Sequence, residues 1–340
     1  MTRRLNVAIV GATGAVGKTM LAVLAERDFP VDVLYPLASA KSVGETVRFG
    51  KLNLDILDLA TFDFTGVDIA LFSAGASVSK EYAPIAAAAG CIVIDNTSCF
   101  RYDDDIPLVI PEVNPERIAD YTHRGIIANP NCSTIQMLVA LKPLHDAVGI
   151  SRINVATYQA VSGTGKRAIS ELISQMGHLL NGRPVKPEVY PQQIAFNVIP
   201  HIDEFQENGY TREEMKMVWE TKKILNDDTI LVNPTAVRVP VFLGHSESIH
   251  IETDSKISRS EVIELLARSP GVKVMSDDIK AGYPTPVKNA ANTDAVYVGR
   301  IREDISHPNG INMWVVSDNI RKGAALNSVQ ILEKLVTEYY

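Results

Sequence analysis

A glycine-rich turn near the start of the chain constrains its fold most strongly. The segment Gly11-Ala-Thr-Gly-Ala-Val-Gly17 follows a short apolar run, Leu5–Val10, and leads into a helical pattern over Ala15–Arg27. Glycines at such a turn let the backbone approach a pyrophosphate, and the helix N-terminus attracts the phosphate charge. The spacing is G-x-x-G-x-x-G rather than G-x-G-x-x-G, so a strand–helix turn without a ligand remains the alternative. The turn predicts the first βα unit of a dinucleotide-binding domain.

Short apolar runs continue to alternate with helical patterns up to about residue 130. This alternation is typical of a parallel sheet with helices on both faces. Further strands are expected at Val31–Leu37, Asp68–Phe72, Cys91–Asp95 and Gly125–Ala128, and helices at Lys80–Ala89 and Cys132–His145.

The pattern changes after about residue 150. Arg152–Ala160 and Val237–Ile251 are β-rich and alternate better, which predicts strands with one buried face. Four prolines predict a long extended loop over Asn181–Pro200. Helices are expected at Gly165–Leu180, Thr211–Leu225 and Gly323–Thr337.

The bulk composition is that of an ordinary globular protein. Of 340 residues, 46% are hydrophobic and 21% are charged, and the net charge of −7 argues against nucleic acid or an anionic membrane as the main partner. The apolar run Leu5–Val10 is too short for a secretory signal, and no stretch suggests a membrane span. Three scattered cysteines favour a reducing compartment, and we expect the cytoplasm.

The end of the second expected strand indicates which dinucleotide the turn would hold. An NAD site usually carries an acidic residue about 20 residues beyond the glycines, where it binds the ribose 2′-hydroxyl. Here the region reads Ser39-Ala-Lys41-Ser42, with hydroxyls and a cation but no carboxylate. A lone lysine is commonly just a solvated loop charge. Together with the two serines, however, it favours a 2′-phosphate, so we expect NADP.

Cys132 is the candidate nucleophile. It ends the segment Asn129-Pro-Asn-Cys132, where an expected strand gives way to an expected helix. A cysteine in the first helical turn lies in the field of the helix dipole, which favours the thiolate, and the free N–H groups there can stabilise an oxyanion. The alternative for a free cysteine is a small buried apolar residue. Cys91, inside an apolar run, fits that role, and Cys99 is ambiguous.

A thiolate nucleophile requires a partner for proton transfer, and His245 is the candidate. As a strand, its segment places His245, Glu247 and Ile249 on one face and His250 on the other. The two histidines therefore do not share a metal, and no metal site is expected. Taken alone, His245 would more commonly be structural. The case for catalysis comes from the family pattern below.

Five motifs occur in order along nearly the whole chain: Gly-Ala-Thr-Gly-Ala-Val-Gly, Asn-Pro-Asn-Cys-Ser-Thr-Ile-Gln, Tyr-Gln-Ala-Val-Ser-Gly-Thr-Gly, Arg-Val-Pro-Val with His-Ser-Glu-Ser, and Asp-Asn-Ile-Arg-Lys-Gly-Ala-Ala. Together they resemble the aspartate-semialdehyde dehydrogenase family. The resemblance implies NADPH-dependent reductive dephosphorylation of L-aspartyl 4-phosphate to L-aspartate 4-semialdehyde, which supplies the lysine, threonine and methionine pathways. It also implies a Cys132 thioester, with His245 as acid/base.

The resemblance further assigns contacts for a substrate that carries a carboxylate, an ammonium group and a phosphate. Arg238 matches the carboxylate position, Arg101 and Lys216 the phosphate positions, and Glu213 the ammonium position, although Glu213 and Lys216 alone would suggest a routine ion pair. Gln159 matches a substrate-binding glutamine, and Asn131 is expected to help hold the oxyanion. The implied cofactor contacts are Gly11, Thr13, Gly14, Ala15, Val16, Ser39, Lys41, Ser42, Ser73, Gly75, Ser162, Gly163 and Asn319.

The expected fold class is α/β, with a Rossmann-like NADP-binding domain over residues 1–130 and 322–340 and an α+β catalytic and dimerisation domain over 131–321. The C-terminal helix would thus return to the first domain. The family resemblance implies a homodimer or homotetramer. Three positions depart from the usual pattern: Lys41 stands where Arg is common, Ala76 where a second Gly is frequent, and Cys99 where a small residue is usual.

Two alternatives remain. An N-acetyl-glutamyl-phosphate reductase type would keep the fold and the thiolate, but it usually shows Pro-Gly-Cys rather than the Asn-Cys found here. A catalytically silent paralogue serving as a binding protein could lose the nucleophile, whereas Cys132 and His245 are both present.

Overall fold

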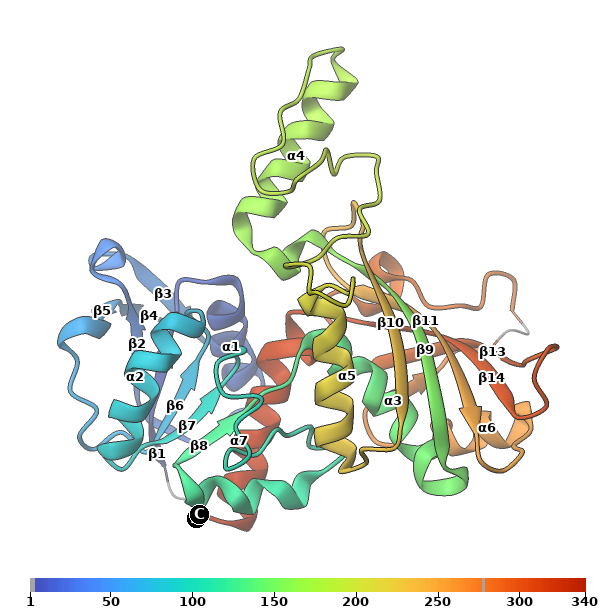
Figure 1. Ribbon diagram of the computed structural model, residues 1–340. Helices are drawn as coiled ribbons and strands as arrows, with labels where there is room; N and C mark the ends of the chain where they lie inside the picture. Colours follow the sequence, from blue (N-terminus) through green and yellow to red (C-terminus); the bar gives the residue numbers. More distant parts are fainter. Residues whose placement is uncertain (1–3, 277–278) are drawn as a thin grey trace. The chain divides into compact units, whose positions relative to one another are not determined.

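A computed structural model describes residues 4–276 and 279–340 (Figure 1). The chain forms two compact units. Unit 1 comprises the residues up to Pro130 together with Ala324–Tyr340, and unit 2 comprises Asn131–Gly323.

Unit 1 is built on a six-stranded parallel sheet with the order β5-β2-β1-β6-β7-β8. Its strands are β1 (Leu5–Val10), β2 (Val31–Ala38), β5 (Leu57–Asp58), β6 (Ile69–Phe72), β7 (Ile92–Asp95) and β8 (Ile126–Ala128). Its α-helices are α1 (Ala15–Glu26), α2 (Ala76–Ala88) and α7 (Leu326–Glu338). Because the central strands run parallel and are covered by helices, the side chains of β1, β6, β7 and β8 are almost all buried, whereas β2 is buried only towards its carboxyl end.

Helix α7 packs against α1 in unit 1. Leu21 and Leu24 of α1 share one apolar cluster with Val329, Leu332 and Leu335 of α7. The bidentate pair between Arg27 and Glu333 adds a polar contact at the rim of this cluster. The Rossmann-like sheet and the return of the last helix are therefore confirmed.

Three short strands in unit 1 were not foreseen. β3 (Thr46–Phe49) and β4 (Leu52–Asp55) form a separate hairpin, and β5 is only two residues long. Their side chains are largely exposed, so they lack the apolar run that marks the other strands. Helix α2 begins at Ala76 rather than Lys80 because Gly75, with φ of 104°, ends the preceding turn.

Unit 2 contains a mixed six-stranded sheet with the order β10-β9-β11-β14-β13-β12. Its strands are β9 (Ile150–Gln159), β10 (Leu231–Arg238), β11 (His245–Thr253), β12 (Val272–Val274), β13 (Val296–Glu303) and β14 (Gly310–Ser317). Its α-helices are α3 (Cys132–Val148), α4 (Lys166–Leu180), α5 (Arg212–Leu225) and α6 (Arg259–Ala267). Helix α3 packs on one face of this sheet, against β9, β11, β13 and β14.

The expected β-rich run Val237–Ile251 is two strands rather than one. β10 starts at Leu231 and ends at Arg238, and β11 starts only at His245. Pro240 cannot donate to a ladder, and Gly244, with φ of 89°, turns the chain back, so the strands separate between them. The predicted alternation within β11 is confirmed, since His245, Glu247 and Ile249 are buried while Ser248 is exposed.

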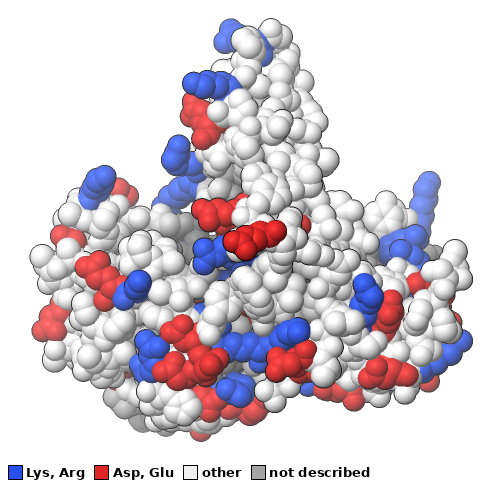
Figure 2. Space-filling view, in the orientation of Figure 1, with Lys and Arg blue, Asp and Glu red and all other residues white. Residues whose placement is uncertain are grey.

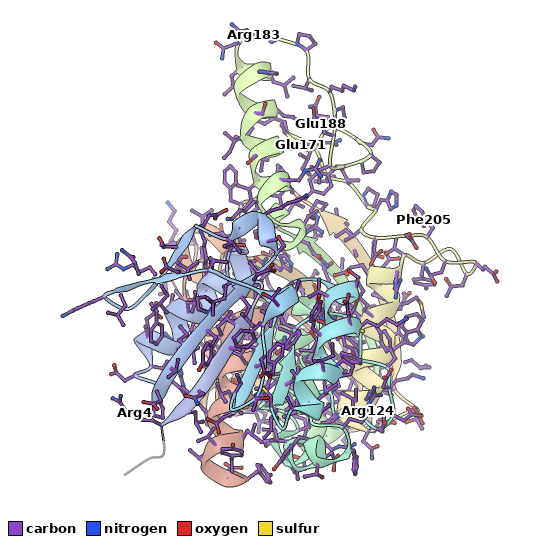
Figure 3. All side chains as sticks on the ribbon, turned by 90° about the vertical axis from the view of Figure 1, so that its left-hand side faces the viewer. Arg4, Arg124, Glu171, Arg183, Glu188 and Phe205 are labelled. Carbon is purple, nitrogen blue, oxygen red and sulfur yellow. The ribbon has the colours of Figure 1, made fainter. Side chains whose placement is uncertain are left out.

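Helix α4 and the proline-rich segment after it project from the sheet of unit 2 as an arm (Figure 1). Two α4 side chains hold the returning segment. Glu171 accepts from the backbone N–H groups of Glu188 and Val189, and Gln175 accepts from those of Ile194 and Ala195. Figure 3 labels Glu171 and Glu188 along this arm. The expected extended loop is thus fixed by side-chain bonds along the arm and by one antiparallel bridge from Ile199 to Arg238.

The surface facing the viewer in Figure 2 carries lysine and arginine interspersed with aspartate and glutamate. It offers no broad basic field of the kind that tracks nucleic acid. Within the described ranges, none of the helices is both long and apolar enough to cross a bilayer.

Candidate active site

Cys132 is the first residue of helix α3. Asn131 is the N-cap: its side-chain oxygen accepts from the backbone N–H of Ser133 at 2.9 Å, which satisfies one of the free donors at the helix start. The backbone of Gly323 lies against the nucleophile, because a Cβ built on Gly323 would stand 2.7 Å from the Cβ of Cys132. Cys132 itself is only partly buried. The prediction that Cys132 lies in the first turn of a helix is therefore confirmed.

Three predicted site residues end or begin strands at one edge of the unit 2 sheet. β9 and β10 run parallel and pair Gln159 with Arg238 at their last residues. β11 runs antiparallel to β9 and starts there with His245. The three side chains are fully or almost fully buried. Strand register therefore collects an amide, a guanidinium and an imidazole at this edge.

A hydrogen-bonded network joins the helix start to this edge. The carboxylate Oε1 of Glu213 accepts from the Asn131 amide at 3.0 Å and from the Gln159 amide at 3.2 Å. Gln159 also donates to the Ser133 hydroxyl at 3.0 Å. Thus Glu213, in the first turn of α5, binds both the N-cap of α3 and the end of β9.

Lys216 completes the network on α5. Its ammonium donates to Glu213 at 2.9 Å and to Asp203 at 2.8 Å. Burial by itself would raise the pKa of Glu213, but Lys216, the Asn131 amide and Arg238 outweigh it and lower that pKa to about 2. Burial also opposes the charged form of Lys216, yet the two carboxylates raise its pKa. Lys216 thus uses two of the three donors of its ammonium group on carboxylates.

His245 is held in one orientation by the backbone. Its Nδ1 accepts from the N–H of Ala160 at 3.0 Å, whereas Nε2 has no bonding partner among the described residues. Burial and the charge of Arg238 lower its pKa to about 3, against the opposing effect of Glu213. The ring is therefore neutral near pH 7 and carries its proton on Nε2.

Arg238 keeps part of its donor fork available. Its Nη1 donates to the Ala160 carbonyl at 2.6 Å, and its guanidinium lies 5.9 Å from the centre of the Tyr190 ring. Its buried Nε has no partner among the described residues. A Cβ on Gly163 would come within 3.1 Å of Arg238 Nη1 and 3.5 Å of the His245 ring. The glycine thus leaves space directly in front of both side chains.

The predicted cofactor contacts of unit 2 also come together. Ser162 and Asn319 are hydrogen-bonded at 3.0 Å, and Asn319 Oδ1 accepts from the N–H of Gly244 at 2.9 Å. Gly244 directly precedes His245, so Asn319 braces the turn that leads into β11.

A hollow of about 500 Å³ in unit 1 contains the glycine turn. It is lined by Gly11, Thr13, Gly14, Ala38, Ser39, Ala40, Asp58, Leu59, Ala60, Ser73, Ala74, Val78 and Tyr82. A Cβ on Gly11 would lie 3.0 Å from the backbone of Ser73 and Ala74, and one on Gly17 would lie 2.2 Å from the Gly11 carbonyl. Gly11 and Gly17 are therefore required for the tight packing of this turn against its own backbone and against the loop after β6, as expected for the glycines of a dinucleotide-binding turn. Ala15 and Val16 open α1, with Gly14 as N-cap.

Five predicted cofactor contacts of unit 1 lie outside this lining: Ala15, Val16, Lys41, Ser42 and Gly75. Lys41 and Ser42 belong to the short 3-10 turn Ala40–Ser42, and Lys41 is exposed. Sequence reasoning also missed Asp58, which brings a carboxylate to the hollow from the end of β5, beside Ala38 of β2. A two-residue strand leaves no period in the sequence. The place of Asp58 at the carboxyl end of a parallel strand is therefore visible only in the structure.

Arg101 lies in unit 1 and is buried. Its guanidinium donates to the backbone carbonyls of Thr97 at 3.0 Å and Asn96 at 3.3 Å. The loop after β7 thereby fixes its direction.

The other cysteines differ from Cys132. Burial raises the pKa of Cys91, which fits its expected apolar role. Burial also raises the pKa of Cys99, followed by the charges of Asp95 and Asp103, so this thiol is held in its neutral form. The nearby cations Lys80 and Arg124 oppose this shift without reversing it, so Cys99 is not an activated thiol.

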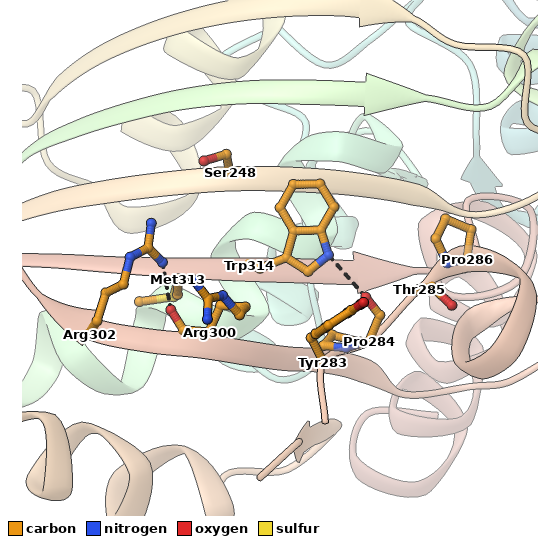
Figure 4. Close-up of a pocket in the computed structure, with 9 residues that line it drawn as sticks. All are labelled: Ser248, Tyr283, Pro284, Thr285, Pro286, Arg300, Arg302, Met313 and Trp314. Carbon is orange, nitrogen blue, oxygen red and sulfur yellow. Dashed lines mark hydrogen bonds between the residues drawn. The ribbon is translucent and has the colours of Figure 1, made fainter. Parts of the chain in front are cut away.

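A further hollow lies in unit 2 and contains none of the predicted site residues (Figure 4). Trp314, which donates to the Pro284 carbonyl at 3.0 Å, lines it together with Tyr283, Arg300 and Arg302. Ser248, also in its lining, is on the β11 face opposite His245. This hollow is therefore separate from the Cys132 cluster.

Comparison with known proteins agrees with this geometry. Residues 6–121 match the family profile described as semialdehyde dehydrogenase, NAD binding domain, and residues 141–322 match the one described as semialdehyde dehydrogenase, dimerisation domain. The chain is 68% identical to an aspartate-semialdehyde dehydrogenase of Legionella pneumophila over 339 residues, which cover 100% of this chain and 98% of the relative. It is 51% identical to the aspartate-semialdehyde dehydrogenase of Bacillus subtilis, with 98% of both chains covered.

Similarity to solved structures agrees with these sequence matches. The crystal structure of aspartate semialdehyde dehydrogenase II complexed with ASA from Vibrio cholerae superposes with a TM-score of 0.98 at 59% identity, covering 100% of both chains. The enzyme with NADP from Candida albicans superposes with a TM-score of 0.77 at 25% identity, covering 98% of both. A thiol at a helix start, the glycine turn of unit 1 and full-length similarity agree: this chain belongs to the aspartate-semialdehyde dehydrogenase family.

Proposed function

We propose that this chain catalyses the NADPH-dependent reductive dephosphorylation of L-aspartyl 4-phosphate to L-aspartate 4-semialdehyde, through a thioester on Cys132. The observation that carries the proposal is the cluster around Cys132. In that cluster His245 Nε2 and Arg238 Nε are buried donors without a partner among the described residues. Buried donors of this kind await an acceptor from a ligand.

The nucleophile and the oxyanion donors of the first chemical step belong to unit 2. The Cys132 thiolate attacks the acyl carbonyl, and the negative charge that develops on the carbonyl oxygen is met by N–H groups at the start of α3 and by the Nε2–H of His245. The C–O bond to phosphate then breaks with its electron pair on phosphate, which leaves a thioester. We assign His245 the donor part of its acid/base role, because Ala160 occupies Nδ1.

The cofactor supplies a hydride for the reduction of that thioester when it is bound. The glycine turn, Thr13, Ser39 and Ser73 would hold it in unit 1, with Lys41 close to the 2′-phosphate, and Ser162, Gly163 and Asn319 would contact it from unit 2. Collapse of the resulting adduct returns the C–S electron pair to Cys132 and frees the aldehyde. Oxyanion stabilisation by His245 assists again here.

The substrate's fixed charges match the cluster. Arg238 would bind the α-carboxylate with its free Nε side, since a guanidinium and a carboxylate form parallel hydrogen bonds. Glu213 stays ionised near pH 7, as its lowered pKa requires, and would meet the ammonium group. Lys216 and Arg101 would meet phosphate, with Lys216 released from Asp203.

Assembly and location follow from the same proposal. The dimerisation-domain match supports a homo-oligomer, and we propose a dimer or a tetramer in the cytoplasm, where thiols stay reduced. The pathway role would be in lysine, threonine and methionine biosynthesis.

The test is phosphate-dependent reduction of NADP with L-aspartate 4-semialdehyde, compared with its one-carbon-longer analogue and with NAD. The proposal expects the aspartate compound and NADP to be preferred. Preference for the longer compound would indicate the related glutamyl type, and absence of any activity would favour a silent relative.

A further inference from the structure

Glu247 is a buried acid for which the chemistry above has no use. Its side chain is fully buried on β11, two residues beyond His245 and on the same face. Neither carboxyl oxygen has a bonding partner among the described residues. An ionised carboxylate without a partner is costly in such a place, so the group persists as a neutral acid. In agreement, burial raises the pKa of Glu247 well above its ordinary value.

Gln136 is the matching group on the opposing helix. It lies on α3 one turn after Cys132, is almost fully buried, and its Nε2 also lacks a partner among the described residues. Helix α3, which carries Gln136, packs against β11, and the Gln136 side chain lowers the pKa of Glu247 against the effect of burial. A neutral carboxylic acid and a primary amide are complementary, because each offers one donor and one acceptor to the other.

Few other groups face Glu247. Strand register places Thr157 of β9 and Val315 of β14 beside it, and His245 precedes it on its own face. Of these neighbours and Gln136, only His245 titrates, and its lowered pKa keeps it neutral. Among the residues that the structure describes, no neighbouring charge therefore favours ionisation of Glu247.

We propose that Glu247 is a positioning residue for the Cys132 chemistry: as a neutral acid its carboxyl group and the Gln136 amide, the two buried groups left without other partners, satisfy each other and tie α3 to β11. Cys132 begins the helix and His245 begins the strand, so this pair fixes the sulfur relative to the imidazole. The inference rests on the proposed function, since it concerns the same nucleophile.

The test uses the full chain with Glu247→Ala, Glu247→Gln and Gln136→Ala. Two readouts are followed: kcat and KM for semialdehyde oxidation, and the rate of Cys132 alkylation by iodoacetamide. Loss of the pair should lower kcat and the alkylation rate roughly 10- to 100-fold in both alanine variants, with KM nearly unchanged, as expected for a small displacement of a reacting group. Glu247→Gln should keep kcat and the alkylation rate near their wild-type values, because an amide pairs with an amide equally well.

A pH profile separates positioning from simple packing. As pH rises through the raised pKa of Glu247, the wild-type alkylation rate should fall relative to that of Glu247→Gln, which cannot ionise. Ile249→Ala is the matched control, since it removes buried volume from the same face of β11. It should lower Tm but leave kcat and alkylation within about twofold of wild type. If Glu247→Ala fails to fold, the comparison of wild type with Glu247→Gln and Gln136→Ala still tests the proposal.

Two results overturn the proposal. In one, Glu247→Gln loses as much activity as Glu247→Ala, which means that the ionised form is needed. In the other, Glu247→Ala keeps the wild-type kcat and alkylation rate. Failure of the proposed function gives a different result from these two. In that case Cys132→Ala keeps full activity, or the wild-type chain itself has no activity, and neither result depends on the substitutions at position 247.

Discussion

The imidazole of His245 accepts a hydrogen bond at Nδ1 from the backbone N–H of Ala160, at 3.0 Å. A backbone donor cannot change its role, so it fixes the tautomer of the neutral ring. The proton then stands on Nε2, the one nitrogen without a partner among the described residues. His245 is thereby prepared to donate to an oxyanion rather than to remove a proton from Cys132.

Substitution at His245 tests this donor role. We expect His245→Ala to lower kcat roughly 10²- to 10³-fold, the usual cost of losing one oxyanion donor. His245→Gln should retain clearly more activity than His245→Ala, because the glutamine amide N–H can still donate a hydrogen bond. The amide cannot transfer a proton, so this variant separates the donor role from proton transfer. Steady-state kinetics with both variants provides the measurement. Equal losses in the two would mean that proton transfer at residue 245 is essential.

The Glu213–Lys216 pair predicts an acid-dependent loss of stability. The pKa of Glu213 falls from an ordinary 4.5 to about 2 on folding, so the pair stabilises the fold above pH 4.5. This contribution disappears as pH falls from 4.5 towards 2. The free energy of unfolding in urea should therefore be higher for wild type than for Glu213→Gln near pH 7. This difference in free energy should become smaller as the pH falls towards 2. The exposed control Glu207→Gln should match wild type at pH 7. A difference in unfolding free energy that becomes larger in acid would contradict the lowered pKa of Glu213.

Gly323 should be intolerant of a side chain. An alanine there would place Cβ 2.7 Å from the Cβ of Cys132, so one of the two backbones has to shift. We expect Gly323→Ala to lower kcat by about 10²-fold, the effect of a displacement near 1 Å. Gly177→Ala, in helix α4 with nothing within 4 Å, is the control and should raise stability by about 0.5–1 kcal/mol. Wild-type kcat in Gly323→Ala would refute the contact.

Lys41 tests the expected preference for the 2′-phosphate. Lys41→Glu replaces an exposed cation near the hollow with an acid. The Kd for NADPH, measured by its fluorescence, should rise several-fold, whereas the Kd for NADH should change little, since only NADPH carries the extra phosphate. Equal changes for both cofactors would show that Lys41 does not read this phosphate.

Much of the fold could be predicted from local patterns. The glycine turn after Leu5–Val10 and the apolar strands that follow carry the Rossmann-like sheet, because parallel strands buried on both faces read as continuous apolar runs. The strands β3, β4 and β5 could not be foreseen in this way, since they are short and mostly exposed. β10 and β11 were merged because their boundary depends on a turn at Pro240–Gly244 rather than on a change of period.

The site was predictable where a residue's role follows from its own position. Cys132 at a helix start and the facing of His245 and Glu247 on β11 follow from periodicity and are found in the structure. The bond from Ala160 to His245 and the Asp203 contact of Lys216 depend on tertiary register, which a single sequence does not contain. Asp58 was missed for the same reason.

The most direct test of the account is an acyl-enzyme trap at Cys132. The protein is incubated with L-aspartate 4-semialdehyde and NADP without phosphate, and is then analysed by peptide mass spectrometry. We predict an aspartyl adduct on the Cys132 peptide and, for Cys132→Ala, both no adduct and activity at background, while Cys99→Ala behaves as wild type. An adduct on another residue, or full activity in Cys132→Ala, would contradict the thiolate mechanism.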